Sequence, residues 1–307
     1  MYAHARFTGI FPFLSARAER TKNMARKTLQ ELNLLDDFLF GTLLSSEEFG
    51  EPFARILLEV IFQKKFGRLK VIPQKVYPGR NTNLHGTRLD VYLEEMPDEG
   101  PLERASIYDV EPDNSPGTLR ELARRTRFYH SLIDSKCLKA GLKYEALKNV
   151  IVIFIMSEDL LGEGRMVYTI RSMCEESPEL PYDDGARTLY LHTRGTKGNP
   201  PKALQQLLHY MEQSTEKNAV NDSLRQLHHM VETVKQDGEV AFSYMKSWDR
   251  EARIREEGRK EGRAEGREEG RAEERKKAEL ERQKMEAEIR RLQAELARCQ
   301  GGPEKMR

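Results

Sequence analysis

The sequence predicts an α/β fold with the element order helix, three strands, helix, strand, followed by a long charged helical tail. Two observations carry this prediction. Apolar residues recur at helical spacing between positions 29 and 66, notably Phe53, Leu57 and Ile61. Farther along, residues 149–156 read NVIVIFIM, a run rich in β-branched side chains that is typical of a central strand covered on both faces. We therefore expect a mixed sheet flanked by helices.

The other elements are expected on either side of that strand. In chain order they are extended segments at residues 69–77, 87–94 and 106–111, a helix at 119–135, a short strand at 188–192 and further helices within 202–248. The turn-rich residues 97–101 separate the second and third extended segments, which predicts a meander or hairpin.

Composition bounds the class of protein. The chain has 307 residues, a net charge of +1 and three cysteines, Cys137, Cys174 and Cys299. Such scattered cysteines favour neither a disulfide framework nor a zinc site, and no apolar run reaches the roughly 20 residues that span a bilayer. We expect a cytoplasmic protein with no membrane partner. Because the global charge is small, affinity for nucleic acid must come from a local basic face.

The domain organisation follows from shifts in composition. The predicted parts are an N-terminal extension without a structural role (1–28), a folded domain (29–215), a helical region (216–250) and a charged tail (251–307). The first 23 residues are acid-poor and hold only a short apolar stretch, too short for a secretory signal.

The tail repeats E-G-R-x with a period of four between positions 257 and 270. Such a repeat is a poor isolated helix, because like charges stack at i,i+4 and each glycine costs about 1 kcal/mol relative to alanine. A solvated linker and a helix with a glycine stripe both fit it. Beyond it, a short coiled-coil seam predicts a homo-oligomer formed through the tail, with Met285, Ile289, Leu292, Leu296 and Cys299 along the seam.

Acidic residues gather on the second and third predicted strands. Alternation places Asp90 on the face opposite Leu89 and Val91, and Asp109 and Glu111 on one face of the next strand, with Asp113 beyond. Neighbouring carboxylates repel each other, and a divalent cation with oxygen ligands, such as Mg²⁺ or Mn²⁺, would remove that cost. The alternative interpretation is a solvated sheet face decorated with charges.

A basic strip follows these acids on the helix at 119–135. Arg120, Arg124 and Arg127 fall within about 60° on one face of that helix. They could bind phosphates of a DNA backbone without reading sequence, or they could pair with acids or water.

The motifs LNLLDDFLF, RLDVYLEE, YDVEPD and RRTRFYHSLID, in this order over residues 29–192, resemble the PD-(D/E)XK nuclease family transposases, also called Rpn-type recombination-promoting nucleases. The resemblance implies a restriction-endonuclease-like αβββαβ core. It also implies Mg²⁺-dependent cleavage of DNA, linked to recombination or transposition.

The resemblance assigns roles to individual residues. Asp90 matches the first metal-binding acid and Glu111 the acid of the (D/E)XK element. The third position, Lys or Gln in the family, is Asp113 here, which could assist the metal or the attacking water but lacks the positive charge of Lys. Asp37 is the candidate for an additional acid, with a helix-capping or solvated role as the alternative. Arg124 or Arg127 could restore the missing charge.

Two functions compete at this stage. The first is a Mg²⁺- or Mn²⁺-dependent DNA endonuclease with Asp90, Glu111 and Asp113 as catalytic residues. The second is a catalytically impaired DNA-binding or scaffold protein of the same fold that oligomerises through its tail. The spatial arrangement of the three acids discriminates between them, because acids neutralised by arginine leave no place for a cation.

Overall fold

The computed structural model describes residues 27–77, 87–96, 106–114 and 116–300. Nearly all of the expected N-terminal extension, residues 1–28, lies outside this description. The chain divides into two compact units, Met1–Ala241 and Phe242–Arg307, and each is described by itself.

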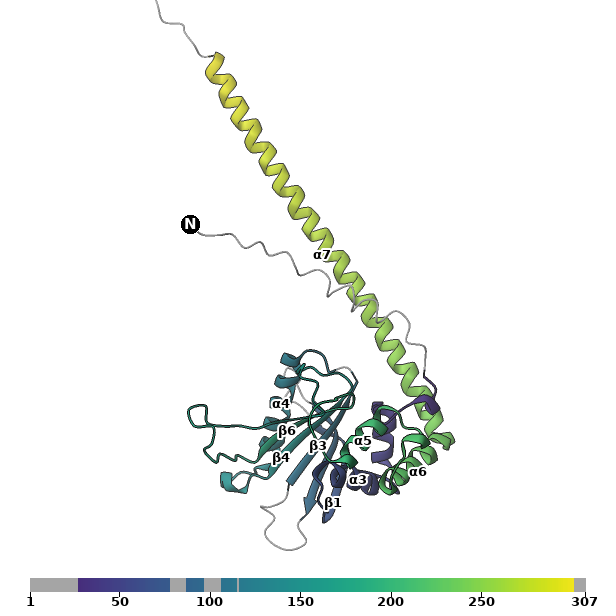
Figure 1. Ribbon diagram of the computed structural model, residues 1–307. Helices are drawn as coiled ribbons and strands as arrows, with labels where there is room; N and C mark the ends of the chain where they lie inside the picture. The colour runs from purple at the N-terminus through teal and green to yellow at the C-terminus, as the bar shows by residue number, and fades with distance from the viewer. Residues whose placement is uncertain (1–26, 78–86, 97–105, 115, 301–307) are drawn as a thin grey trace, which may run out of the picture. The chain divides into compact units, whose positions relative to one another are not determined.

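A six-stranded mixed sheet forms the centre of the first unit (Figure 1). Its strands are β1 (Arg68–Tyr77), β2 (Thr87–Met96), β3 (Ser106–Asp113), β4 (Asn149–Met156), β5 (Val167–Ile170) and β6 (Ala186–His192). Their order is β1-β2-β3-β4-β6-β5. The first three strands are antiparallel neighbours, β3, β4 and β6 run parallel, and β5 pairs antiparallel with β6.

This topology confirms the α/β class, the antiparallel meander and the central place of residues 149–156. Within β4, every residue from Val150 to Met156 is buried, which explains its continuous apolar sequence. The four-residue β5 was not predicted, because so short an edge strand carries little periodic signal.

The first helical stretch is divided where a single apolar pattern was expected. It consists of the 3₁₀ turn η1 (Leu29–Glu31), α2 (Asp37–Ser45) and α3 (Gly50–Phe62). The chain turns after Ser45 so tightly that a β-carbon added to Gly50 would lie 2.5 Å from the carbonyl oxygen of Leu44. Glycine at this position therefore allows α3 to start directly against the end of α2.

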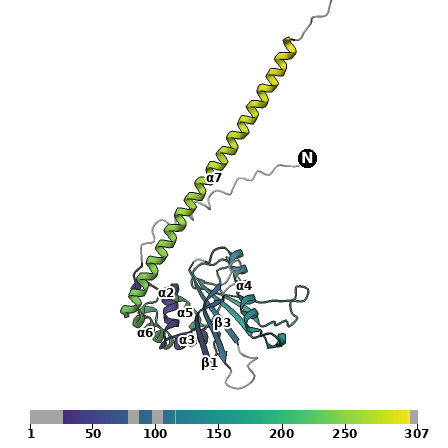
Figure 2. The same cartoon turned by 180° about the vertical axis from the view of Figure 1, so that it is seen from behind.

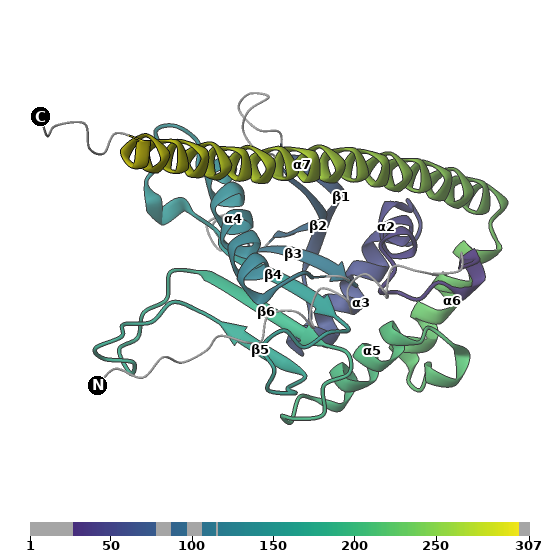
Figure 3. The ribbon, with the colours of Figure 1, turned by 90° about the horizontal axis from the view of Figure 1, so that it is seen from above.

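Helices cover both faces of the sheet (Figures 1 and 3). On one face lies α4 (Leu119–Cys137), which begins with a capping box in which Thr118 and Glu121 exchange hydrogen bonds of 3.2 and 2.9 Å. On the other face, α3 brings Phe62 to an edge-on contact with Tyr108 of β3, at 5.1 Å between ring centroids. The result is a helix, sheet, helix sandwich.

Two later helices, α5 (Lys202–Glu212) and α6 (Asp222–Gln236), join the layer of α2 and α3 (Figure 2). The buried ammonium of Lys235 on α6 donates a 3.0 Å hydrogen bond to the carbonyl of Gln30, whose side chain donates in return to the Lys235 carbonyl. Burial lowers the pKa of Lys235. This reciprocal pair fastens the start of the folded unit to the end of its last core helix.

The charged tail is helical. Helix α7 (Gly238–Gln300) continues through the E-G-R-x repeat, with Glu–Arg pairs such as Glu279–Arg282 at 3.0 Å along its surface. The glycines of the repeat face open space. The expected seam is solvent-exposed in the single chain; Met285 is 63% and Leu296 61% exposed. Among the described residues, no helix has the length and apolar character that crossing a membrane requires.

Replacing Gly50 by alanine should destabilise the first unit by about 1–3 kcal/mol, because the new β-carbon would collide with the carbonyl oxygen of Leu44 and force the backbone to shift. Urea denaturation followed by near-UV circular dichroism measures this change. The matched control is Gly258→Ala in α7, where the added methyl group meets open space and should favour the helix. An unchanged urea midpoint for Gly50→Ala would contradict the packing described for the α2–α3 turn.

Candidate active site

Strand β3 turns its acidic residues toward α4. Asp109 is fully buried and Glu111 is 7% exposed, on the same face as Ile107, which belongs to the core beneath α4. Tyr108 points the other way, toward α3. The period-two prediction for this strand agrees with these positions, but the interpretation of Asp109 and Glu111 as a solvated decoration is wrong.

The pairing of β2 with β3 indicates where the backbone of Asp90 lies relative to β3. Tyr92 pairs with Asp109 and Leu93 with Tyr108, so the two strands advance in opposite directions one residue at a time. Continued by two residues, this register brings the backbone positions of Asp90 and Glu111 to corresponding places on neighbouring strands. The side chain of Asp90 itself lies outside the described residues.

Asp113, at the end of β3, is engaged by a cation that the sequence analysis did not single out. Its carboxylate forms a short ion pair with the guanidinium of Arg125 on α4. Burial by itself would lower the pKa of Arg125, but the hydrogen bond and charge of Asp113, together with the charge of Glu111, raise it. Asp113, at the position where the motif has Lys or Gln, therefore holds Arg125 in place.

The same guanidinium lies over an aromatic floor. The carbon at the centre of the Arg125 guanidinium is 4.9 Å from the ring centroid of Phe154 on β4, and that ring stacks with Tyr129 and packs beside Tyr190. A cation over a ring face gains about 0.5–2 kcal/mol, more where water is excluded. Arg125 is thus fixed by an acid on one strand and a ring on the next.

Further polar contacts fix α4 along the sheet. Thr126 shares a 3.0 Å hydrogen bond with the hydroxyl of Tyr190, and His130 shares one of 3.0 Å with Thr188, both on β6. Burial lowers the pKa of His130, so its neutral form is favoured. Because these contacts lie on β6 and the Arg125 ion pair lies on β3, α4 is anchored across three parallel strands.

The predicted basic strip faces the solvent. Arg120, Arg124 and Arg127 are exposed, and no acid in the described part of the chain pairs with them. Arg124 and Arg127, expected to supply the missing positive charge, face the solvent, whereas Arg125, which is half-buried, pairs with Asp113. The strip remains available to an external anion.

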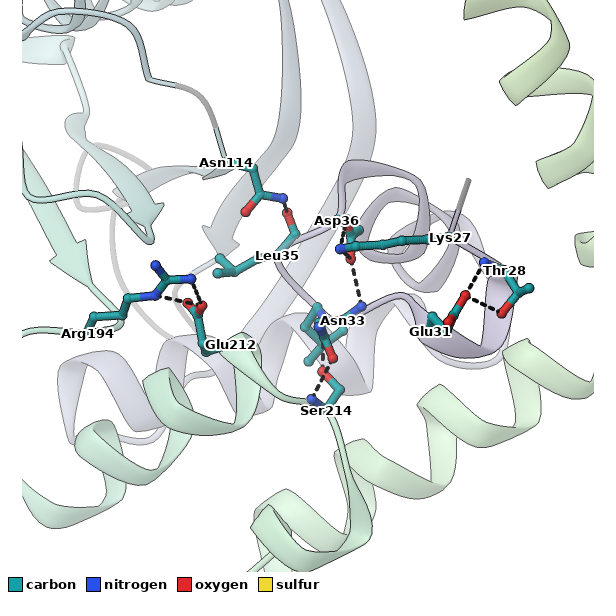
Figure 4. Close-up of polar contacts among 11 residues, drawn as sticks. Lys27, Thr28, Glu31, Asn33, Leu35, Asp36, Asn114, Arg194, Glu212 and Ser214 are labelled. Atoms are coloured by element: carbon teal, nitrogen blue, oxygen red, sulfur yellow. Dashed lines mark hydrogen bonds and ion pairs between the residues drawn. The ribbon is translucent and has the colours of Figure 1, made fainter. Parts of the chain in front are cut away.

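Asp37 lies in the first turn of α2 and is exposed. The segment leading into α2 is held close to the end of β3, because the side-chain amide of Asn114 donates a 2.5 Å hydrogen bond to the carbonyl of Leu35 (Figure 4). Asn33 accepts a 2.9 Å hydrogen bond from the backbone of Ser214, which ties the same segment to the end of α5. The neighbourhood of Asp37 is thereby placed beside the residue that follows Asp113.

The donor set can be compared with what a divalent cation requires. Mg²⁺ and Mn²⁺ prefer carboxylate oxygens, and Glu111 offers a buried carboxylate at the position that the family motif assigns to the metal. One carboxylate oxygen of Asp113 is engaged by Arg125. Within the described ranges no group of three His, Cys, Asp or Glu residues could hold a metal ion, so a site here depends on Asp90.

These acids, the arginine and the anchored helix define the candidate site. No family model, curated protein or solved structure matches the chain.

Sequence reasoning missed two residues of this site. A helical wheel of α4 shows that Arg125 lies three positions after buried Leu122 and four before buried Tyr129. An arginine on an apolar stripe, opposite a strand of acids, was the available signal. Asp109 was placed on the face of Glu111 but given no role of its own, although its place among Ile107, Tyr108 and Val110 indicated burial.

Replacing Arg125 by alanine should lower the free energy of unfolding by about 1–3 kcal/mol, because Asp113 then loses the cation that neutralises it in a half-buried place. Arg124→Ala is the matched control on the exposed face of the same helix and should change stability by less than about 0.5 kcal/mol. Urea denaturation of both variants measures the difference. Equal effects of the two substitutions would show that the ion pair contributes nothing.

Proposed function

We propose that the chain is a metal-dependent endonuclease that hydrolyses phosphodiester bonds of DNA. The observation that carries the proposal is the buried carboxylate of Glu111 on a sheet face covered by α4. The β2–β3 pairing ends at Tyr92 and Asp109, and its continuation by two residues would set Asp90 opposite Glu111. The antiparallel β1-β2-β3 meander, the α4 crossover and the parallel strand β4 also agree with the restriction-endonuclease-like core that the sequence motifs suggest.

Asp90 and Glu111 would hold Mg²⁺ or Mn²⁺. A bound ion of this kind lowers the pKa of its water and stabilises negative charge on a phosphate under in-line attack. On this proposal Asp113 is neither ligand nor base. Its role is to position Arg125, whose guanidinium lies close enough to Glu111 for the two charges to interact.

Arg125 replaces the positive charge that the motif lacks at Asp113. A guanidinium stays protonated at all relevant pH values, so Arg125 cannot accept a proton from water. It can stabilise the negative charge that develops on the phosphate, and its ion pair and ring contact hold it in place before substrate arrives. This arrangement spares reorganisation during the reaction.

The DNA backbone would lie along the exposed strip of α4. Arg120, Arg124 and Arg127 point away from the core and provide three cations on one helix face. Because the net charge is only +1, this local strip would supply the attraction to phosphates, and binding should weaken as salt rises. Contacts of this kind carry no sequence preference. A role in recombination or transposition rests on the family resemblance alone.

Two observations favour a second candidate, a catalytically impaired DNA-binding or scaffold protein. Asp113 is occupied by Arg125, and the described residues hold no cluster of three potential metal ligands. In that case the buried acids and Arg125 would act only as a polar network that anchors α4. Such a protein would keep the arginine strip and bind DNA without cutting it.

We also propose that α7 joins two or more copies of the chain. Its seam residues are exposed in the single chain, and helices in proteins gain most of their stability by packing an apolar face against a partner.

Purified protein should nick supercoiled plasmid in Mg²⁺ or Mn²⁺ but not in Ca²⁺ or EDTA. Glu111→Gln and Asp90→Asn should each lower the rate at least about 100-fold, because each removes a charged metal ligand. Glu163→Gln, an exposed acid far along the chain, is the matched control and should cut at the wild-type rate. Gel electrophoresis of the plasmid follows the reaction.

The two candidate functions give different results in this assay. Folded wild-type protein that binds plasmid yet leaves it intact in every metal would remove the nuclease proposal and support the DNA-binding protein. Cleavage that persists at the wild-type rate in both acid variants would point to a contaminating nuclease or a different site.

Self-association through α7 can be tested by placing charged side chains at the apolar seam positions. Leu292→Lys combined with Leu296→Lys should reduce the molar mass measured by light scattering to that of one chain. The control substitution Glu295→Lys, between them in sequence but off the seam, should leave the mass unchanged. A wild-type protein that is already monomeric at micromolar concentration would overturn the proposed assembly.

A further inference from the structure

A pocket of about 500 Å³ lies on the sheet face opposite α4, near the edge formed by β5 and β6. Its volume is within the range of sites that bind small molecules, about 300–1,000 Å³. It shares no lining residue with the acids of β3 or with the arginine strip of α4. Whatever it binds is therefore separate from the proposed nuclease site.

The floor and walls of the pocket are apolar. Ile151 of β4 and Leu189 and Leu191 of β6 form the floor, because odd-numbered residues of these strands point away from α4. Ile61 of α3 and Leu204 of α5 close the sides and are 8% and 3% exposed. Such walls favour a ligand with an aliphatic or aromatic body.

Two cations line the pocket at different places, and no acidic residue lines it. Val167 pairs with Leu191, and continuing that register by two residues sets Arg165 opposite Thr193, well along the sheet from Arg187. Arg165 and Arg187 are both exposed lining residues. Arg187 has a partner in Asp183 at 3.3 Å, but both side chains are more than half exposed, so this pair is weak and an incoming anion could replace it. No acid in the described segments pairs with Arg165. The charge of the lining therefore matches an anion.

The backbone that carries Arg165 is held firmly. The amide of Met166 donates to the carbonyl of Lys197 at 3.0 Å, and the amide of Lys197 donates to the carbonyl of Gly164 at 2.9 Å. Gly195 packs so closely against this segment that a β-carbon there would lie 2.6 Å from the backbone nitrogen of Met166. The backbone of Arg165 is thus held at the pocket, so only its side chain has to be ordered when an anion binds.

We propose that this pocket binds a small amphipathic carboxylate, with the apolar body on the floor of β4 and β6 and the carboxylate at Arg165. Arginine presents paired N–H donors that match a carboxylate, and an apolar floor beside a cation fits a molecule with one acidic end. The lining offers no acid to hold an amine, so a cationic amphiphile of the same size is excluded.

Octanoate is the probe, and octylammonium, which has the same tail length and the opposite charge, is its control. Isothermal titration calorimetry with the full chain should show one octanoate site per chain and no octylammonium binding. Arg165→Ala should weaken octanoate binding about five- to tenfold, in line with the loss of one charge-assisted contact. Arg225→Ala, an exposed arginine on α6, should leave the affinity unchanged.

A second variant tests the place of binding without touching the cations. Thr169→Trp on β5 adds a large ring at an exposed lining position, where the core is not disturbed, and should abolish octanoate binding in a folded protein. Octanoate binding that survives Thr169→Trp, or equal binding of octylammonium, would overturn the proposal. So would the absence of any octanoate binding to the folded wild-type chain.

Discussion

The arrangement of the first unit depends on how the carboxylates of β3 are kept beneath a helix. Asp109 and Glu111 are buried on a largely apolar and aromatic sheet face, and such charges are costly unless they are compensated. Arg125, paired with Asp113, provides a charge that interacts with Glu111. Because Arg125 belongs to α4 and Asp113 to β3, this contact also sets where α4 lies on the sheet. The aromatic floor and the hydrogen bonds to β6 then follow from that position.

Alternation along the strands separates the two faces of the sheet by chemistry. On β3, Tyr108 contributes to a cluster of rings with α3, while Asp109 faces α4. On β4, Phe154 supports Arg125 and Ile151 lines the pocket on the opposite face. One sheet can thus support a charged site on one side and an apolar, cation-edged pocket on the other. The two sites need no common residue.

Much of the fold could be predicted because hydrophobic periodicity is a direct consequence of burial. The apolar run of β4 and the period-two pattern of β3 gave the central strand and the orientation of Glu111. Tertiary contacts decided the rest. A charged residue is assigned to the surface by default, so the functional cations were expected at Arg120, Arg124 and Arg127. The partial burial of Arg125 depends on Asp113, which comes from β3 and is distant in sequence. The register of Asp90 with Glu111 likewise depends on strand pairing, which sequence separation does not reveal.

We propose a division of labour on β3, in which Glu111 would hold the cation and Asp113 positions Arg125. Mn²⁺ binding, followed by electron paramagnetic resonance on wild-type, Glu111→Gln and Asp113→Asn proteins, tests it most directly. The account predicts that Glu111→Gln abolishes Mn²⁺ binding, whereas Asp113→Asn retains binding but unfolds at a lower urea concentration. Binding lost in Asp113→Asn and kept in Glu111→Gln, or no Mn²⁺ binding by the folded wild-type protein, would contradict it.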